Sequence, residues 1–307
     1  MSFEPPVGVI GIGLMGEVFA RRLVAAGFSV TGFDVDPDKT ARLIEFGAHP
    51  AASIGDVARA ANPIVLAVFD TSQVEQVVEQ ELLPVLTAPG RSDKVVMCTS
   101  TCDPDRVAAL AARVEDRGLK FLETPVSGTS EQVRQGDGVG LIGGDPAVAA
   151  EVDDVLHALF PKRFHVGRAG DGGRTKLAVN LILGLNRMAL AEGLVFATRL
   201  GLEPNAFFKV AQASASYSQV MDTKGRKMIA SDFRPEGRAR QTLKDVHLML
   251  EQAEKIGQPL PMLRVHCDAL EACVRNGEGD LDNSVVVQEI RRRGERKAMR
   301  PLTRAAD

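Results

Sequence analysis

Gly11-Ile12-Gly13-Leu14-Met15-Gly16 follows an apolar run and opens a segment of helical periodicity, so these residues occupy a strand-to-helix turn. Their G-x-G-x-x-G spacing permits a tight turn, close approach of the backbone to a pyrophosphate, and close packing of the helix on the strand. The start of such a helix also offers unpaired N–H groups to phosphate. We interpret the turn as the phosphate-binding turn of a dinucleotide-binding domain; a tight turn that binds nothing is the alternative.

Asp34 closes the second predicted strand, 23 positions after Gly11. A carboxylate at this place would accept hydrogen bonds from the adenosine ribose hydroxyls and would repel a 2′-phosphate. No arginine stands among the four residues that follow Asp34, and Lys39 is expected at an exposed position of the next helix. The sequence therefore predicts NAD as the cofactor, with NADP as the alternative.

The first half of the chain alternates short β-rich runs with amphipathic segments. Repeated βα units of this kind predict a parallel, doubly wound sheet. Val139–Ile142 and Phe164–Val166, with a helix over Pro146–Leu159 between them, would extend this sheet past six strands. The other predicted strands are Val7–Ile12, Ser29–Phe33, Pro63–Val68, Lys94–Thr99 and Leu119–Glu123, and the helices between them include Glu17–Ala26 and Pro104–Arg117.

The second half of the chain keeps helical periodicity without β-rich runs. Between Gly172 and Leu200 there is no proline and apolar residues recur near helical spacing, which predicts one long helix. The expected fold class is α/β: a Rossmann domain with a doubly wound parallel sheet over residues 1–168, then an all-α domain over 169–307, with the long helix between the domains. Further helices are expected over Asn205–Ala213, Thr242–Ile256 and Pro261–Arg275.

The composition is typical of a soluble globular protein. The chain has 307 residues, 45% hydrophobic and 25% charged, which is enough to build a core without a partner. A formal charge of −3 argues against nucleic acid as a partner, and we identify neither a membrane span nor a signal sequence. The four cysteines lack the spacing of a zinc site, so we expect no metal and interpret them as reduced thiols of a cytoplasmic protein.

A second glycine-rich turn, Gly170–Gly173, leads into the long helix and is followed by Lys176 and Asn180. Side chains four residues apart share one face of a helix. A lysine near a domain junction can stabilise and protonate the alkoxide that hydride delivery to a carbonyl produces, and the asparagine can hold the ammonium or a substrate hydroxyl. A solvated lysine beside a helical asparagine is the alternative, and spacing alone favours it.

The chain resembles the β-hydroxyacid dehydrogenases, the family of 3-hydroxyisobutyrate dehydrogenase, tartronate semialdehyde reductase and γ-hydroxybutyrate dehydrogenase. The resemblance implies an active site in the cleft between a Rossmann domain and a helical domain, and a homodimer or homotetramer. It also implies a nicotinamide-dependent dehydrogenase whose partner is a small carboxylate-bearing hydroxy acid. The matching segments are Gly11–Gly16, Ser100–Pro104, Pro125–Gly128, Gly143-Gly144, Gly170–Asn180, Lys244-Asp245 and Asp280–Ser284.

The resemblance implies roles for individual residues at the reacting centre. Lys176 corresponds to the family's catalytic lysine, the general acid/base, and Asn180 to the asparagine that works beside it. Ser127 and Gly128, with Thr129 after them, correspond to the segment that binds the substrate carboxylate. A serine hydroxyl and successive backbone N–H groups suit an anion, although an ordinary turn is the alternative.

Two more residues correspond to family positions that contact the cofactor. Thr101 matches a Ser/Thr position in the loop before the Pro104–Arg117 helix, and Lys244 matches a lysine of the helical domain. A helix-capping hydroxyl and a solvated lysine are the respective alternatives.

Several positions depart from the family pattern, and they leave the substrate open. Thr129 stands where a second glycine is usual, and Glu123-Thr124 replaces the usual Asp-Ala. The lone tyrosine, Tyr217, lies in a polar loop near the expected cleft. At the far end, Gln288–Asp307 carries seven basic and three acidic side chains and is expected to be solvated or frayed.

The leading interpretation is an NAD-dependent enzyme that interconverts a short, 3-hydroxyisobutyrate-like 3-hydroxy acid and its semialdehyde or ketone. One alternative is a phosphogluconate dehydrogenase. These enzymes have a histidine immediately before the asparagine that corresponds to Asn180, whereas this chain has Val179, which disfavours decarboxylation of their substrate. Imine reductases of the same fold usually replace the lysine, so Lys176 favours a hydroxyl substrate. A non-catalytic dinucleotide-binding module is the third alternative.

Overall fold

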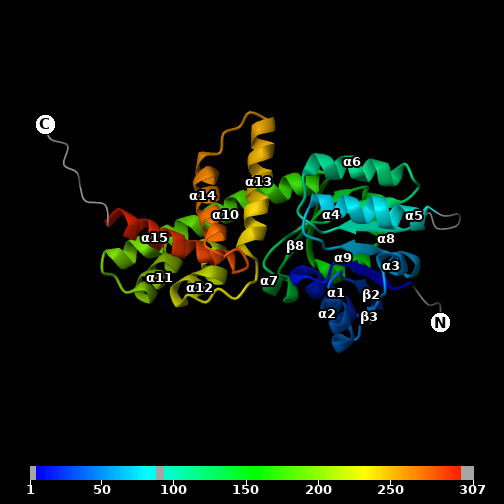
Figure 1. Cartoon of the computed structure of the whole chain (residues 1–307), viewed down its shortest axis with the longest axis horizontal. Coiled ribbons are helices and arrows are strands. Elements are labelled where there is room, and N and C mark those ends of the chain that lie inside the picture. The colour runs from blue at the N-terminus through cyan, green and yellow to red at the C-terminus, as the bar shows by residue number, and fades with distance from the viewer. Residues whose placement is uncertain (1–4, 88–92, 299–307) are drawn as a thin grey trace. The chain divides into compact units, whose positions relative to one another are not determined.

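The computed structural model describes residues 5–87 and 93–298 (Figure 1). Its contacts divide the chain into two compact units, Met1–Ala178 and Val179–Asp307. The sequence places the boundary earlier, at 168/169. The division falls inside the long helix because the first residues of that helix pack with the first unit: Gly173 lies against Pro104, and Arg174 pairs with Asp105 at 2.8 Å.

A nine-stranded sheet forms the centre of the first unit in the described residues. Its order is β3-β2-β1-β4-β5-β6-β8-β7, with β9 paired to β8, and every pair from β3 to β6 is parallel. The predicted Rossmann class and the extension past six strands are therefore confirmed. The strands are β1 (Val7–Ile10), β2 (Val30–Phe33), β3 (His49–Pro50), β4 (Ile64–Leu66), β5 (Val95–Cys98), β6 (Lys120–Glu123), β7 (Val126–Ser127), β8 (Val139–Gly144) and β9 (Lys162–Gly167).

The sheet is mixed at one end, because β8 runs antiparallel to β6, with Glu123 opposite Gly143. The connection between these strands holds only the two-residue strand β7 and the five-residue helix α7 (Ser130–Arg134). Neither is long enough to return the chain to the start of β6, which a parallel pairing requires. After β8, two helices carry the chain back and β9 pairs with β8 in parallel.

Helices cover both faces of the sheet because the buried strands alternate their apolar side chains (Figure 1). In β5, Val95 and Met97 belong to one core cluster, and Val96 and Cys98 belong to the other. The first cluster includes residues of α1 (Leu14–Ala25), η1 (Arg42–Phe46), α7, α8 (Pro146–Glu151) and α9 (Asp153–Leu159); the second includes α3 (Ile54–Ala60), α4 (Thr71–Gln76), the π-helical segment η2 (Val77–Leu82), α5 (Leu83–Leu86) and α6 (Pro104–Glu115). A short helix, α2 (Pro37–Ala41), has no buried residue.

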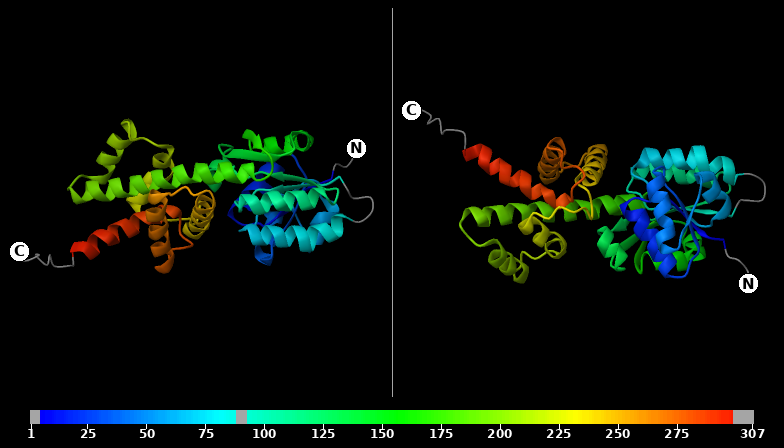
Figure 2. Two further views of the ribbon diagram at one scale, coloured as in Figure 1. Left: turned by 90° about the horizontal axis from the view of Figure 1, so that it is seen from above. Right: turned by 60° about the horizontal axis from the view of Figure 1, so that its bottom comes forward.

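In its described residues the second unit is built from helices and their connections, and it contains no strand, as predicted. Its core joins Leu194 of the long helix to Phe208, Met228 and Val287, each from a different helix. The helices are α10 (Asp171–Arg199), which begins in the first unit, α11 (Pro204–Ala213), η3 (Met221–Gly225), α12 (Arg226–Ala230), α13 (Ala239–Lys255), α14 (Pro261–Arg275), η4 (Asn283–Val285) and α15 (Val286–Ala298). Figure 2 shows α13 and α14 packed side by side.

Some predicted boundaries need correction. The segment Pro146–Leu159 forms two helices, which are separated at Val152. The helix after the glycine turn starts at Leu14 instead of Glu17, because Gly13 already has extended backbone geometry and acts as its N-cap. The helix Pro261–Arg275 has the predicted bounds.

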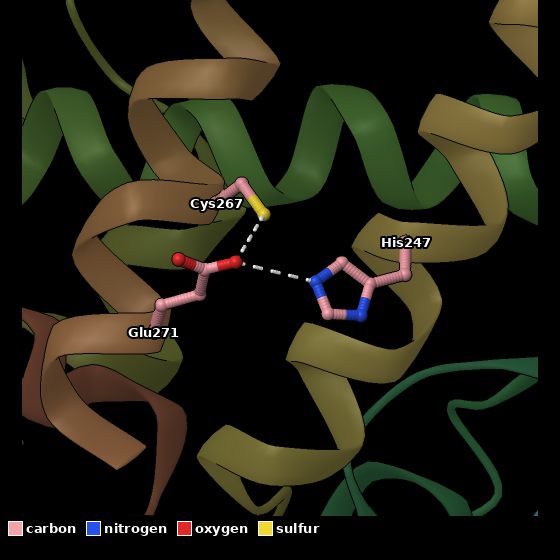
Figure 3. Close-up of side chains that lie close together, drawn as sticks. All are labelled: His247, Cys267 and Glu271. Atoms are coloured by element: carbon pink, nitrogen blue, oxygen red, sulfur yellow. Dashed lines mark hydrogen bonds and ion pairs between the residues drawn. The ribbon is translucent and has the colours of Figure 1, made fainter. Parts of the chain in front are cut away.

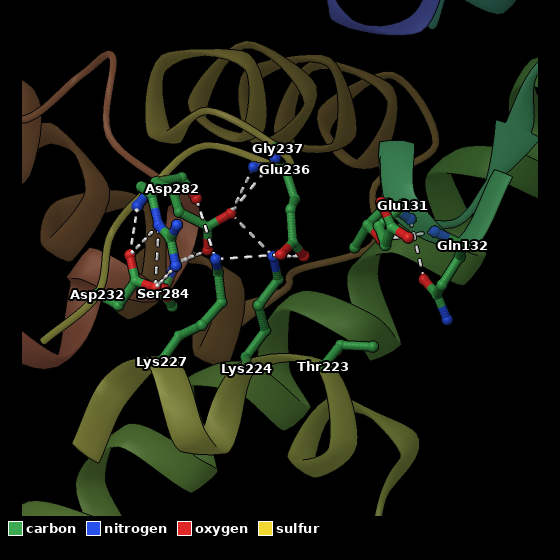
Figure 4. Close-up of polar contacts among 12 residues, drawn as sticks. Glu131, Gln132, Thr223, Lys224, Lys227, Asp232, Glu236, Gly237, Asp282 and Ser284 are labelled. Carbon is green, nitrogen blue, oxygen red and sulfur yellow. Dashed lines mark hydrogen bonds and ion pairs between the residues drawn. The ribbon is translucent and has the colours of Figure 1, made fainter. Parts of the chain in front are cut away.

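The segment Asp280–Ser284, one of the segments that match the family, contains half of a buried ion pair (Figure 4). Lys224 Nζ lies 2.9 Å from Asp282 Oδ2, and both side chains are buried. The backbone N–H groups of Glu236, Gly237 and Ser284 also donate to the Asp282 carboxylate. Burial raises the pKa of Asp282, but Lys224 and these donors outweigh that effect and hold the pKa below its usual value. The segment therefore has a structural role, joining three stretches of the helical unit.

The C-terminal segment is a packed helix as far as the structure describes it, and not the frayed end that its charge suggests. Within α15, Arg292 makes two hydrogen bonds to Glu278, at 2.7 and 2.8 Å, and one to the buried Glu289 at 2.9 Å. Residues 299–307 lie outside the described residues.

Among residues 5–87 and 93–298, one helix is long and apolar enough to be a candidate membrane span. An 18-residue window of α10 has a mean hydropathy of 1.4. Core helices of globular proteins meet the same criteria of length and composition, and the buried side chains of Lys176 and Arg187 interrupt the apolar residues of α10. The length and composition of α10 are therefore weak evidence for a membrane.

Candidate active site

The glycine turn after β1 has the geometry that a bound pyrophosphate requires. Gly11 has a φ of +90°, and a Cβ there would lie 2.6 Å from the carbonyl oxygen of Ala67. A Cβ on Gly16 would lie 1.8 Å from the carbonyl oxygen of Gly11, so the helix can pack on the turn only without a side chain. A Cβ on Gly13 would meet nothing within 4 Å. The turn is thus tightly packed at Gly11 and Gly16, and the space in front of it, on the side of Gly13, is open.

The start of α1 has no side-chain cap, whereas six other helices of this unit have one. Its N-cap is Gly13, and no side chain accepts a hydrogen bond from its first turn. Uncapped N–H groups at the positive end of a helix dipole form an anion site. The open turn and the uncapped helix together fit a dinucleotide phosphate. The capped helices of this unit are α2 (Asp36), α3 (Ser53), α4 (Asp70), α6 (Asp103), α7 (Thr129) and α8 (Asp145).

Asp34 is joined to the glycine turn, as the motif predicts. Its Oδ2 accepts the N–H of Ile12 at 2.7 Å, and its Oδ1 accepts the N–H of Asp36 at 2.9 Å. Lys39, expected to be exposed, lies with its Nζ 3.5 Å from a carboxylate oxygen of Asp34 and 3.5 Å from one of Asp36. A cation is therefore close to the carboxylate that would contact the ribose, where the sequence led us to expect an exposed lysine.

Thr101 follows β5 in a loop fixed to the neighbouring strand. The hydroxyls of Thr99 and Ser100 donate to the carbonyl oxygens of Leu66 and Val68, each at 2.7 Å. Thr101 is half-buried and comes next in the chain. Since β1, β4 and β5 are parallel, this loop and the glycine turn both lie at the carboxyl edge of the sheet, where such sheets bind dinucleotides.

Ser127, Gly128 and Thr129 connect β7 to α7. Ser127 is half-buried, and Gly128 has a φ of +148° with its Cβ position 3.3 Å from the Cα of Gly138, so the loop requires glycine there. Thr129 forms a capping box: its hydroxyl accepts the N–H of Gln132 at 3.2 Å, and its own N–H donates to the Gln132 side chain at 2.9 Å. Thr129 therefore has a structural role as a helix cap, which its departure from glycine did not reveal.

Lys176 and Asn180 lie one turn apart on α10, so they share a face of the helix. The Lys176 side chain is buried, with 6% of the residue exposed. Asn180 Nδ2 donates to Asp245 Oδ2 at 3.1 Å, while no described donor reaches the buried Asn180 Oδ1. The Asp245 carboxylate can only accept, so it fixes the amide with Oδ1 as the remaining acceptor.

Asp245 is a further candidate site residue, and the sequence analysis assigned it no role. It is buried on α13, and its Oδ1 lies 3.0 Å from Nζ of the neighbouring Lys244. It thereby joins two predicted site residues, Asn180 and Lys244, through one carboxylate. The sequence could have indicated Asp245, because the pair Lys244-Asp245 is one of the segments that match the family. The sequence analysis assigned a role only to Lys244. The functional roles of Lys176, Asn180 and Lys244 stay predictions.

Glu123 explains the glycine-rich start of α10. It ends β6, is buried, and its Oε2 accepts the N–H of Gly170 at 2.8 Å. Cβ atoms on Gly172 and Gly173 would come within 2.9 and 2.7 Å of its carboxylate oxygens, so these glycines allow the close approach. Burial raises the pKa of Glu123 to about 7, although the N–H groups of Gly173, Gly170 and Gly172 lower it.

This pKa predicts a pH-dependent stability. Between the ordinary value of 4.5 and about 7, the folded state holds a proton on Glu123 that the unfolded chain has lost. The free energy of unfolding therefore falls as pH rises through this window, by up to about 3 kcal/mol in total. Urea unfolding from pH 4.5 to 8 should show the free energy of unfolding of wild type falling relative to Glu123→Gln, which cannot titrate. Parallel pH curves for the two proteins would contradict the assignment.

Comparison with known proteins agrees with this geometry. Residues 6–167 match the NAD binding domain of 6-phosphogluconate dehydrogenase, and residues 170–290 match the family described as NAD-binding of NADP-dependent 3-hydroxyisobutyrate dehydrogenase. The 2-hydroxy-3-oxopropionate reductase of Escherichia coli is 30% identical over 92% of this chain and 96% of its own length. The L-threonate dehydrogenase of Cupriavidus necator is 28% identical over 92% and 95%. The crystal structure of 3-hydroxyisobutyrate dehydrogenase from Salmonella typhimurium has a TM-score of 0.84, with 27% identity over 93% and 99%.

The fold and the glycine turn define a Rossmann protein that binds NAD(P), and the relatives are oxidoreductases. The chain belongs to the β-hydroxyacid dehydrogenase family.

Proposed function

We propose that the protein is an NAD-preferring dehydrogenase that interconverts a short 3-hydroxy acid and its semialdehyde or ketone, with Lys176 as general acid/base. The observation that carries the proposal is the buried Lys176 one helical turn from Asn180, whose amide Asp245 fixes. Family relatives that act on hydroxy acids support the substrate class. Imine reduction and non-catalytic dinucleotide binding are the alternatives that the experiments below distinguish.

A bound nicotinamide cofactor supplies hydride-transfer chemistry, and the residues of this chain must manage the proton. In carbonyl reduction, the Lys176 ammonium would stabilise the negative charge that develops on the substrate oxygen and give that oxygen a proton. In alcohol oxidation, the neutral amine would accept the hydroxyl proton. Asn180 would accept a hydrogen bond through Oδ1, the atom that its contact with Asp245 leaves for a donor.

Substrate orientation would come from the loop after β7. The Ser127 hydroxyl and the backbone N–H of Gly128 suit a carboxylate. Thr129 would shape this loop through its cap on α7, because its hydroxyl already accepts a hydrogen bond from Gln132. The proposed substrate is thus a small carboxylate-bearing molecule.

We also propose a cytoplasmic homodimer or homotetramer. The four cysteines are free, which agrees with a reducing compartment.

A substrate panel tests the proposed function. Short 3-hydroxy acids and their semialdehydes should be turned over with NAD and NADH, respectively, in a spectrophotometric assay. A cyclic imine with NADH or NADPH serves as the comparison. Turnover of the imine together with failure on every hydroxy acid would overturn the proposal, and binding of NADH without any turnover would favour the non-catalytic alternative.

Cofactor preference is a separate prediction. Wild type should have a higher kcat/KM with NAD than with NADP. Asp34→Ala should reduce the ratio of these two kcat/KM values about tenfold, since a charged hydrogen bond to the ribose contributes about 1.5 kcal/mol. Steady-state kinetics with both cofactors checks this. The control is Asp38→Ala, which removes a nearby exposed carboxylate that does not contact the glycine turn. A wild-type preference for NADP would show that Lys39 outweighs Asp34.

A further inference from the structure

A cluster of three potential metal ligands lies between two helices of the second unit (Figure 3). His247 comes from α13, and Cys267 and Glu271 come from α14, where they are four residues apart and share one face. The ligand atoms of all three residues lie within 4.8 Å of one another. The cluster thus combines a ring nitrogen, a sulfur and a carboxylate oxygen on two packed helices.

Two of the three separations in the cluster, both to Glu271 Oε1, are close to those between ligands of a tetrahedral ion. His247 Nε2 lies 3.6 Å from Glu271 Oε1, and Cys267 Sγ lies 3.8 Å from the same oxygen. Zinc bonds of about 2.0–2.3 Å at tetrahedral angles place neighbouring ligand atoms about 3.3–3.6 Å apart. A contraction of a few tenths of an ångström at these two pairs would therefore match the two separations to a bound ion.

The surroundings favour a site open to water. Arg275 Nη1 lies 3.4 Å from Glu271 Oε2, which leaves Oε1 directed at the other two ligands. The His247 side chain is 48% exposed, whereas Cys267 is only 6% exposed. An ion would thus reach the cluster from the exposed histidine side and keep water as a fourth ligand.

We propose that His247, Cys267 and Glu271 form a Zn²⁺ site with water completing the coordination. Imidazole, thiolate and carboxylate together are ligands that zinc accepts. The bound ion would link α13 to α14 and stabilise this helix pair. The sequence predicts no metal because His247 stands 20 positions before Cys267, outside the short ligand spacings of zinc motifs, and only the helix pairing brings them together.

Zinc binding at this site must release a proton. Burial raises the pKa of the Cys267 thiol to about 11, with Glu271 and Asp268 adding to the effect and Arg264 opposing it. The thiol is therefore protonated at neutral pH, and the ion binds the thiolate.

The test uses the full chain, stripped with a chelator, and Zn²⁺ alone. Calorimetry should show one ion bound per chain, with proton release seen as a dependence of the heat on buffer ionisation enthalpy. Cys267→Ser, His247→Ala and Glu271→Gln should each weaken binding about 100-fold or more, since even residues that only support ligands cost 10–100-fold. Glu254→Gln and His157→Ala, which alter exposed residues outside the cluster, should bind as wild type does.

Cobalt substitution and melting give independent readouts. Co²⁺ should produce a thiolate charge-transfer band in wild type that Cys267→Ser lacks, and Zn²⁺ should raise the Tm of wild type but not that of the ligand variant Glu271→Gln. Equal Zn²⁺ affinity in wild type and all three ligand variants, or a Co²⁺ spectrum without the thiolate band, would overturn the proposal. Neither result depends on the reaction proposed above.

Discussion

Replacing Lys176 with alanine should lower kcat by about 10²–10⁴-fold, the usual effect of losing an acid–base group. The reason is that the ammonium acts where negative charge develops on the substrate oxygen, while the dinucleotide is bound at the glycine turn after β1. The NADH affinity should therefore change little. Single-turnover and steady-state rates on the best substrate of the panel, together with NADH titration, measure the two effects separately.

Companion variants distinguish chemistry from packing. Lys176→Arg should restore little activity, because a guanidinium keeps the charge but does not readily release a proton at neutral pH. Asn180→Ala should act in the same direction as Lys176→Ala, and the double variant should be less than additive, because both groups serve one transition state. Lys209→Ala, an exposed lysine of α11, is the control. Near-normal kcat in a folded Lys176→Ala protein would mean that the proposed mechanism is wrong.

The parts of the fold that depend on local patterns could be predicted from the sequence. Val95 and Met97 alternate with Val96 and Cys98 across the two faces of β5. A short apolar run of this kind predicts a buried strand from the sequence alone. The antiparallel direction of β8 could not be predicted from the sequence, because β7 has only two residues and is defined by its pairing with β8.

The same distinction applies to the site. The glycine turn and Asp34 belong to one βαβ unit, so the spacing of their motif predicts the hydrogen bond between Ile12 and Asp34. The contact of Glu123 with Gly170 joins residues 47 positions apart, and that of Asn180 with Asp245 joins residues 65 apart. No spacing rule covers such distances, so these residues emerge only when the helices and strands are placed in space.

The second large expected effect is the loss of cofactor binding in Gly13→Trp. Gly13 has a φ of −77° and a ψ of −164°, which any residue can adopt, and its Cβ position has no neighbour within 4 Å. The indole would therefore fit without disturbing the fold and would fill the space in front of the uncapped start of α1, where a pyrophosphate would be held.

Calorimetric titration of Gly13→Trp with NADH should show affinity lowered by more than about 100-fold, equivalent to about 2.7 kcal/mol. Its Tm should stay near that of wild type, and Gly13→Ala should lose less affinity because a methyl group fills little of the space. Gly16→Ala provides the opposite contrast: its Cβ would lie 1.8 Å from the Gly11 carbonyl oxygen, so stability should fall. Wild-type NADH affinity in Gly13→Trp would place the pyrophosphate elsewhere, because an indole and a phosphate group cannot share the space in front of this turn.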